Sequence, residues 1–198
     1  METQPQIVAI VGLCGAGKSE VGDRFVKASF AYLRFGQITL DEVARRGLQP
    51  TEANEKEIRE ALRKEHGMAA FAILNQPKID ALMDEGKPVL VDGLYSWSEY
   101  KILKDKYGSS LTVVAVYAPP EVRYARLEDR RSRYGDDPKM KYRSFSRAEA
   151  KARDYAEIEN IEKAGPIAMA NYTVVNTSTL EELDKQISAI IADITHAV

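Results

Sequence analysis

Short runs of apolar residues alternate along this chain with longer segments in which apolar residues recur every three or four positions. The short runs are bounded by Gly, Pro or charged residues, a pattern typical of buried strands. Five strands are expected, at residues 7–11, 30–35, 88–92, 111–117 and 172–175. The longer segments have the periodicity of amphipathic helices. Eight such segments lie at about residues 17–28, 51–65, 67–75, 77–86, 96–107, 120–133, 144–164 and 180–195.

Strands that alternate with helices predict a three-layer α/β/α fold, in which helices cover both faces of a parallel sheet. Right-handed crossovers bring the loops that follow the strands to one edge of that sheet. The loop 12–19, Gly36, Asp92 and Ala118 should therefore meet in the crevice where open α/β sheets bind ligands. Pro77 is expected to begin a new helix, because the first helical turn tolerates proline.

Size and composition limit the class of protein. The 198 residues, 44% of them hydrophobic, suit one domain spanning residues 1–198. No run of eighteen apolar residues predicts a membrane span, and the first residues lack the basic and apolar regions of a signal peptide. Cys14 is the single cysteine, which excludes an internal disulfide framework. We therefore expect a cytoplasmic protein with no membrane partner.

The net charge of −2 conceals an uneven distribution. Residues 123–153 carry eight arginines and three lysines against five carboxylates, a local charge of +6. Nucleic-acid binding would predict a broader basic surface with interleaved aromatic residues. A local arginine cluster favours a small polyphosphate ligand over a nucleic-acid partner.

The segment Gly-Leu-Cys-Gly-Ala-Gly-Lys-Ser at 12–19 has the full pattern of a phosphate-binding loop, between an expected strand and an expected helix. Its backbone N–H groups and the helix N-terminus would surround the phosphates of a nucleoside triphosphate. Lys18 would reach the β- and γ-phosphates, and the Ser19 hydroxyl would join the shell of a Mg²⁺ ion. The residues expected to bind the nucleotide are Gly12, Cys14, Gly15, Ala16, Gly17, Lys18, Ser19 and Glu20. Cys14 is either a small loop residue or a thiol made reactive by the helix N-terminus.

Asp92 ends the third expected strand and precedes Gly93. A carboxylate at this place beside a phosphate loop can orient the water shell of Mg²⁺. The alternative is a helix cap, although Ser96 could cap the following helix itself. We expect Asp92 to serve the metal.

Arginines follow the fourth expected strand at helical spacing. Arg123, Arg126, Arg130 and Arg133 would lie along one helix face. Arginines recur beyond the turn at 135–138, so residues 131–153 are expected to form a helical lid over the nucleotide. The alternative is a solvated face paired with carboxylates, as Asp129 and Arg133 could pair. A face with this many like charges favours an anionic ligand held by guanidinium groups.

The acceptor side is expected in the helices between residues 37 and 86, across the crevice from the phosphate loop. Asp41 would either accept a hydroxyl proton or serve as a first-turn helix carboxylate, and the sequence leaves both open. Other cations within reach are Arg34, Arg59 and Arg63. Tyr95 and Trp97 could stack on a ligand, and half-buried packing is the simpler expectation for both.

The order of these motifs resembles the P-loop nucleoside monophosphate kinase superfamily over nearly the whole chain. The shared motifs are the loop at 12–19, Phe35-Gly36, Val89–Gly93, Arg126 through Arg130, the arginine lid and Tyr172–Asn176. Within it, the chain is most similar to a mostly archaeal set of adenylate-kinase-like and dephospho-CoA-kinase-like P-loop proteins. That similarity lies at residues 45–51, 62–68, 135–138 and 175–182.

The resemblance implies the P-loop NTPase fold, with five parallel strands in the order 2-3-1-4-5. It also implies that Arg126 stacks on the ATP base, Arg130 contacts its phosphates and Arg153 reaches in from the far side of the lid. The acceptor half departs from the family. Adenylate kinases carry acceptor arginines where this chain has Leu40 and Ser96, and the Asp-x-Asp of dephospho-CoA kinases is missing.

These observations predict an ATP- and Mg²⁺-dependent kinase that phosphorylates a small molecule. Its acceptor would be a nucleotide or nucleotide-like molecule, such as a nucleoside monophosphate or dephospho-CoA. The catalytic residues would be Lys18, Arg126, Arg130 and Arg153, with Ser19 and Asp92 for the metal. The missing acceptor arginines favour an alternative, a nucleotide-dependent switch or slow ATPase that acts through a protein partner. A monomer or a homodimer is expected.

Overall fold

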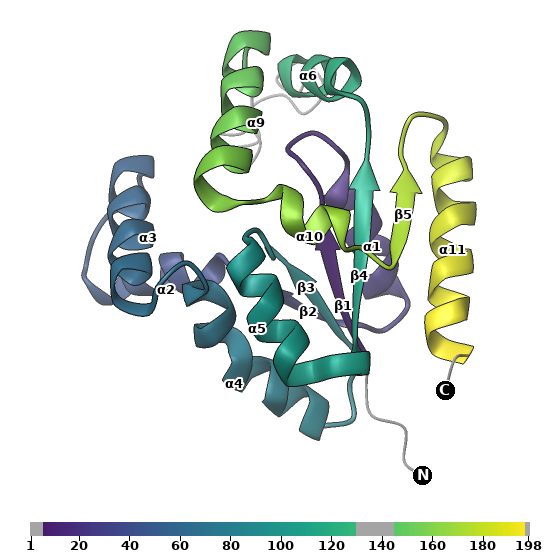
Figure 1. Cartoon of the computed structure of the whole chain (residues 1–198), viewed down its shortest axis with the longest axis horizontal. Coiled ribbons are helices and arrows are strands. Elements are labelled where there is room, and N and C mark those ends of the chain that lie inside the picture. Colours follow the sequence, from purple (N-terminus) through teal and green to yellow (C-terminus); the bar gives the residue numbers. More distant parts are fainter. Residues whose placement is uncertain (1–5, 130–144, 197–198) are drawn as a thin grey trace.

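The computed structural model describes residues 6–129 and 145–196. Its centre is a five-stranded parallel sheet in the order β2-β3-β1-β4-β5 (Figure 1). The strands are β1 Ile7–Val11, β2 Ala31–Arg34, β3 Val89–Asp92, β4 Leu111–Tyr117 and β5 Tyr172–Val175. The expected strand order is thus confirmed, and every strand lies within a residue or two of its expected range.

Helices cover both faces of the sheet. The helices before β4 are α1 Lys18–Lys27, α2 Gln37–Arg45, α3 Glu52–His66, α4 Ala70–Asp84 and α5 Trp97–Tyr107. A short 3₁₀ turn, Gly108–Ser110, leads into β4. The helices after it are α6 Pro120–Glu128, α9 Arg147–Ile161, α10 Ala164–Ala168 and α11 Leu180–His196. Among the described residues, none of these helices is long and apolar enough to cross a membrane.

Side-chain alternation along β1 divides the core into two layers. Ile7, Ala9 and Val11 pack with apolar residues of α4 and α5 on one face. Val8 and Ile10 pack with apolar residues of α1 and α11 on the other. All five side chains of β1 are buried. A strand that helices cover on both faces is apolar at every position, so β1 shows no alternation of polar and apolar residues.

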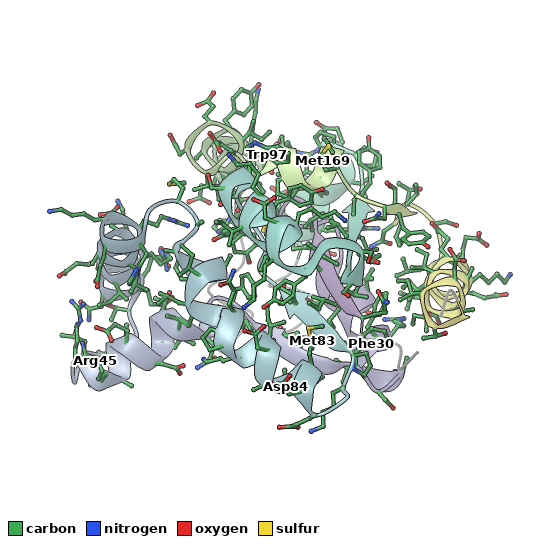
Figure 2. The ribbon with its side chains drawn as sticks, turned by 60° about the horizontal axis from the view of Figure 1, so that its bottom comes forward. Phe30, Arg45, Met83, Asp84, Trp97 and Met169 are labelled. Atoms are coloured by element: carbon green, nitrogen blue, oxygen red, sulfur yellow. The ribbon has the colours of Figure 1, made fainter. Side chains whose placement is uncertain are left out.

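The acceptor-side helices extend beyond the sheet. In Figure 1, α2 and α3 lie at one end of the molecule and α11 lies at the other. Arg45, the last residue of α2, lies at the periphery in Figure 2 and pairs there with Glu42. α2 and α3 pack against each other at this end of the molecule.

The expected break at Pro77 is wrong, because α4 is one helix with Pro77 inside it. An interior proline costs about 3 kcal/mol, since it lacks the N–H that would bond to the carbonyl of Ile73. Pro77 and Ile73 both lie on the exposed side, where that carbonyl can bond to water. The opposite side stays in the core on both sides of the proline, at Phe71, Asn75 and Ile79. Burial of that continuous face stabilises the unbroken helix.

The helix expected at 144–164 is also corrected. It begins later, because Ser146 is the N-cap and forms a reciprocal capping box with Glu149. It ends at Ile161, and a separate short helix, α10, follows. The described part of α6 ends at Glu128, so the expected end of that helix at Arg133 lies outside the described residues.

A buried ion pair joins α6 to α9. Arg123 donates to both carboxylate oxygens of Asp154, at 2.9 and 2.7 Å, and each residue is 4% exposed or less. Tyr124 donates to the same carboxylate at 2.9 Å. The guanidinium also donates to the carbonyls of Ala118 and Cys14, at 3.0 and 3.1 Å. Arg123 is thus a structural residue, and its placement among ligand-binding arginines was wrong, because a carboxylate of α9 compensates its charge.

Replacing Asp154 by Ala should lower the free energy of unfolding by about 3–5 kcal/mol, because it leaves the Arg123 charge buried and unpaired. Urea denaturation followed by circular dichroism measures the change. The matched control is Glu181→Ala, which removes an exposed 3.0 Å pair with Lys185 and should cost less than about 1 kcal/mol. The double variant Arg123→Met/Asp154→Leu should recover most of the loss. A loss under about 1 kcal/mol for Asp154→Ala would contradict the structural role.

Candidate functional site

The loops that follow the strands meet at the carboxyl edge of the sheet. They carry the segment 12–19 after β1, Gly36 after β2, Gly93 after β3, Ala118 after β4 and Asn176 after β5. This is the edge at which open α/β sheets bind ligands, as the alternation of strands and helices predicted.

The phosphate loop fits tightly against the ends of its neighbouring strands. Gly12 has a φ of +145°, and a Cβ there would lie 2.5 Å from the carbonyl oxygen of Val116 in β4. Gly17 is the N-cap of α1 with a φ of +103°, and a Cβ there would lie 2.1 Å from the Asn176 side-chain amide. Both positions require glycine, since they combine a left-handed backbone with no room for a side chain.

Lys18 closes this loop. Its ammonium donates to the carbonyls of Gly12 and Leu13, at 2.9 and 3.2 Å. Burial, and after it the positive charge of Lys163, lowers the pKa of Lys18 to about 8. The loop carbonyls therefore fix the position of the ammonium. A bound phosphate there would stabilise the protonated form of Lys18.

The other loop residues are positioned by backbone contacts. The buried Ala16 donates its N–H to the carbonyl of Leu13 at 3.2 Å. A Cβ on Gly15 would lie 2.7 Å from the carbonyl oxygen of Arg123. Cys14 is half-buried and packs against the small cluster of Tyr124, Leu127 and Ala150, which supports its reading as a small loop residue.

Glu20 stands one residue past the metal-side Ser19, but its carboxylate pairs with Arg24 at 2.7 Å within α1. A role for Glu20 in nucleotide binding would therefore fall to its backbone N–H.

Ser19 and Asp92 line one pocket of about 420 Å³. Its other lining residues are Tyr32, Leu33, Arg34, Gln37 and Lys78. The hydroxyl of Ser19 and the carboxylate of Asp92 are the oxygen donors that Mg²⁺ prefers. No group of three or more His, Cys, Asp or Glu side chains gathers around a possible metal position in the described part of the chain. This donor set fits a Mg²⁺ ion that takes its remaining ligands from nucleotide phosphates and water.

Asp92 does not cap the helix that follows it. Ser96 is the N-cap of α5 and forms a capping box with Glu99. Asp92 instead accepts a 2.7 Å hydrogen bond from the hydroxyl of Tyr32 on the neighbouring strand. Asp92 lines the pocket together with Ser19.

Asn176 connects the phosphate loop to Arg126. Its side-chain amide donates to the carbonyl of Ala16 at 2.8 Å, and its own carbonyl accepts from Arg126 at 2.9 Å. Arg126 is thus placed beside the loop, where the resemblance assigned it to the nucleotide base. Arg130, the other arginine of this helix expected at the phosphates, lies outside the described residues, as do Arg133 and Arg143.

A chain of charges leads from the expected lid toward Lys18. Glu157 accepts from Arg153 at 2.9 Å and from Lys163 at 2.6 Å. Burial alone would raise the pKa of Glu157, but the charge and hydrogen bond of Lys163 hold that pKa below its usual value. Lys163 is 4% exposed, and its ammonium lies 4.5 Å from the centroid of the Tyr95 ring. Tyr95 therefore packs under a protein cation, and Arg153 is oriented by Glu157.

Three residues with clear places in this site escaped the sequence reasoning. Asn176 directly follows β5 at the carboxyl edge, a position that topology alone could have singled out. Asp154 gave no such signal, because its partner Arg123 is distant in sequence. Lys163 pairs with the nearby Glu157, but its contact with the Tyr95 ring depends on the fold.

Asp41 lies in α2 next to the pocket. It accepts from Gln37 at 2.9 Å and lies 3.7 Å from the ammonium of Lys78. Both partners line the pocket, while Asp41 itself does not. The helices at 37–86 therefore contribute Gln37 and Lys78 to the space next to the metal-side residues.

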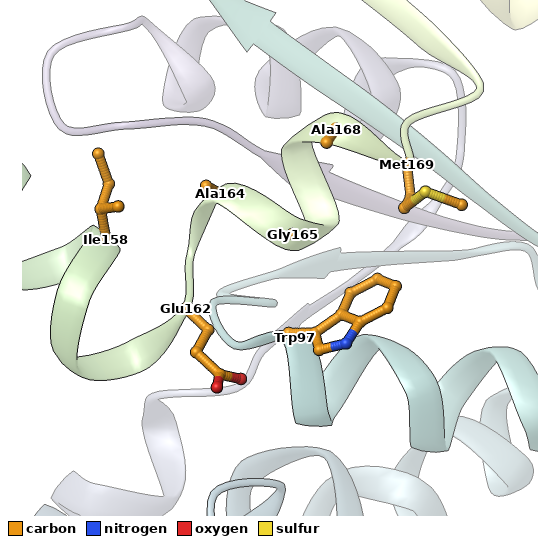
Figure 3. Close-up of a pocket in the computed structure, with 7 residues that line it drawn as sticks. All are labelled: Trp97, Ile158, Glu162, Ala164, Gly165, Ala168 and Met169. Atoms are coloured by element: carbon orange, nitrogen blue, oxygen red, sulfur yellow. The ribbon is translucent and has the colours of Figure 1, made fainter.

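A second pocket, of about 410 Å³, lies apart from these residues (Figure 3). It is lined mainly by apolar atoms of Trp97, Ile158, Glu162, Ala164, Gly165, Ala168 and Met169. Trp97 stacks on Tyr100 with ring centroids 5.1 Å apart, and a Cβ on Gly165 would lie 2.8 Å from its ring. Half-buried packing therefore describes Trp97, and none of the residues expected at the nucleotide or the metal lines this pocket.

Comparison with known families matches residues 8–163 to an AAA domain. A UPF0200 protein of Thermococcus onnurineus is 31% identical over 189 residues, which cover 95% of this chain and 97% of the relative. The phosphate loop, the residues that line the pocket with Ser19 and Asp92, and Arg126 all lie within the matched residues 8–163.

Solved structures share the fold at lower identity. A gluconokinase from Sinorhizobium meliloti is 15% identical, with a TM-score of 0.58 over 99% of this chain and 97% of that one. A shikimate kinase from Bacteroides thetaiotaomicron is also 15% identical, with a TM-score of 0.57 over 96% and 98%. The fold is therefore that of small P-loop kinases.

Above pH 8, the protein should take up a proton when it binds a nucleotide. The negative phosphates raise the pKa of Lys18 from about 8, so the complex binds more protons than the free protein and affinity falls as pH rises past 8. Calorimetry in two buffers of different ionisation enthalpy should give a clear proton uptake at pH 8.5 and a much smaller one at pH 7. Lys163→Met should reduce the uptake at pH 8.5, because it removes a charge that lowers this pKa. Equal, near-zero uptake at both pH values would contradict the assignment.

Proposed function

The chain belongs to the UPF0200 protein family, and on that premise we propose that it is a cytoplasmic, ATP- and Mg²⁺-dependent phosphotransferase for small molecules. One observation carries the proposal. The pocket that contains Ser19 and Asp92 is continuous with the space lined by Arg34, Gln37 and Lys78 on the acceptor side. A phosphoryl group leaving the loop would therefore enter a space that can hold a second substrate.

The pocket volume of about 420 Å³ is within the range of sites for small molecules. A nucleoside monophosphate and dephospho-CoA are the first acceptors to test, because the motif order resembles kinases of such molecules. The solved structures of similar fold are named as a gluconokinase and a shikimate kinase, and they extend the panel to sugar acids and related carboxylates.

Phosphoryl transfer depends mainly on positioning and on electrostatic stabilisation of the transferring group. The loop N–H groups and Lys18 would hold the β- and γ-phosphates. Ser19 and Asp92 would hold the Mg²⁺ ion, which neutralises phosphate charge when it is bound. Arg126 would contact the nucleotide from the Asn176 side.

Arg153, oriented by Glu157, would contribute positive charge from α9. Asp41 would act on the acceptor only through Gln37 and Lys78, its partners in the pocket wall. No strong general base is required for this reaction.

A coupled assay of ADP release tests the proposal. The panel holds Mg-ATP with each ribo- and deoxynucleoside monophosphate, dephospho-CoA, gluconate or shikimate. One acceptor should stimulate ADP release at least tenfold over ATP alone. Lys18→Ala should abolish the stimulated rate, and Asp92→Asn should raise the Mg²⁺ concentration for half-maximal rate by about tenfold or more.

The same assay distinguishes the alternative. ATP binding with slow turnover that no acceptor stimulates would contradict the transferase and favour a nucleotide switch or slow ATPase. A stimulated rate that survives Lys18→Ala would contradict the assignment of the phosphate loop as the donor site.

A further inference from the structure

The sequence places three arginines within reach of the acceptor side, Arg34, Arg59 and Arg63, and their contacts in the structure differ. Arg59 is already paired, with Glu52 at 2.6 Å and with Glu55 at 3.4 Å. Arg63 lies 5.4 Å from the centroid of the Phe71 ring and does not line the pocket. Arg34 does line it. Arg34 is therefore the one of the three that a ligand in this pocket could meet directly.

Arg34 has no anionic partner within the part of the chain that the structure describes. Its guanidinium forms no hydrogen bond, ion pair or ring contact with another described residue. It is the last residue of β2, and its Cα is in register with that of Asp92 on β3. Arg34 and Asp92 therefore lie side by side at the carboxyl edge of the sheet, where both line the pocket.

The pocket gives Lys78 and Asp92 a partner and leaves Arg34 without one among the described residues. Its charged lining residues are Arg34, Lys78 and Asp92. The Asp41 carboxylate lies beside Lys78 at 3.7 Å. Asp92 accepts from Tyr32 and would face a Mg²⁺ ion that is bound together with the nucleotide phosphates, so it does not compensate the charge of Arg34. An acceptor that carries its own negative charge would supply a partner for that guanidinium.

We propose that Arg34 recognises an anionic group of the acceptor, and that the acceptor is a phosphate- or carboxylate-bearing small molecule rather than a neutral sugar or nucleoside. The planar guanidinium can donate two parallel hydrogen bonds to either group. If Arg34 holds the anionic group at the end of β2, the reacting atom of the acceptor would lie on the side of the pocket that Ser19 and Asp92 line. This inference rests on the proposed transferase and assigns its specificity to one residue.

Calorimetry on the protein saturated with Mg²⁺ and a non-hydrolysable ATP analogue tests the inference without requiring turnover. The phosphate arm uses AMP and CMP, with adenosine and cytidine as neutral counterparts. The carboxylate arm uses gluconate and shikimate, with glucose as the neutral counterpart. At least one anion should bind, and its neutral counterpart should bind at least tenfold more weakly.

Arg34→Ala should weaken binding of that anion by about thirtyfold, because a charged, bidentate contact is lost. Arg34→Lys should be intermediate, since it keeps the charge but loses the planar fork. Arg59→Ala is the matched control, because its guanidinium is already paired, and it should change binding by less than about twofold. All three variants should keep wild-type affinity for the ATP analogue.

The inference is overturned if none of the anions binds, if the neutral counterparts bind equally well, or if Arg34→Ala has no effect. Failure of the proposed function looks different. Arg34-dependent anion binding without transfer of phosphate from ATP would support the role of Arg34 and contradict the transferase.

Discussion

The packing of the phosphate loop against the ends of β4 and β5 is the constraint on which the rest of the site depends. Gly12 lies against the carbonyl of Val116, and Gly17 lies against the side chain of Asn176. These contacts exist because β1 is the central strand of the order β2-β3-β1-β4-β5. The sheet topology thereby fixes the loop, and the loop fixes Lys18 and Ser19 relative to Asp92 on the next strand.

The two sides of β1 have different tasks in this arrangement. On the β4 and β5 side, Arg123, Asp154 and Asn176 hold α6, α9 and the loop together through buried polar contacts. Such contacts are strong only when each polar group has its partner, so this half is built to be rigid. On the β3 and β2 side, Asp92 and Arg34 line the pocket, where Asp92 accepts from Tyr32 and Arg34 has no partner among the described residues. The first half is suited to positioning a donor, and the second leaves room for an acceptor.

Sequence patterns predicted the fold well, because short apolar runs and helical periodicity follow directly from burial on two faces of a sheet. They failed at Pro77, where local propensity indicated a break and tertiary packing of Phe71 and Ile79 kept the helix intact. They also failed at Arg123, which shares a helical spacing with Arg126 but faces Asp154. Spacing along one helix reveals which residues share a face, but it does not reveal what that face meets.

The candidate site divides in the same way. The phosphate loop and Asp92 could be identified from local sequence, because their chemistry depends on a contiguous motif and on a strand end. The contacts of Asn176 with Ala16 and Arg126, and that of Lys163 with Tyr95, come from long-range packing, so the local sequence does not reveal them. The choice of Arg34 among the acceptor-side arginines likewise required knowledge of which guanidinium groups are already paired.

The fate of the γ-phosphoryl group separates transfer to an acceptor from transfer to water. Reactions with Mg-ATP and the acceptor panel, run in ¹⁸O-labelled water, would be followed by ³¹P NMR. We expect the γ-phosphorus signal to be replaced by that of a phosphorylated acceptor without ¹⁸O. Accumulation of ¹⁸O-labelled inorganic phosphate instead, whichever acceptor is present, would show transfer to water and contradict the proposed phosphotransferase.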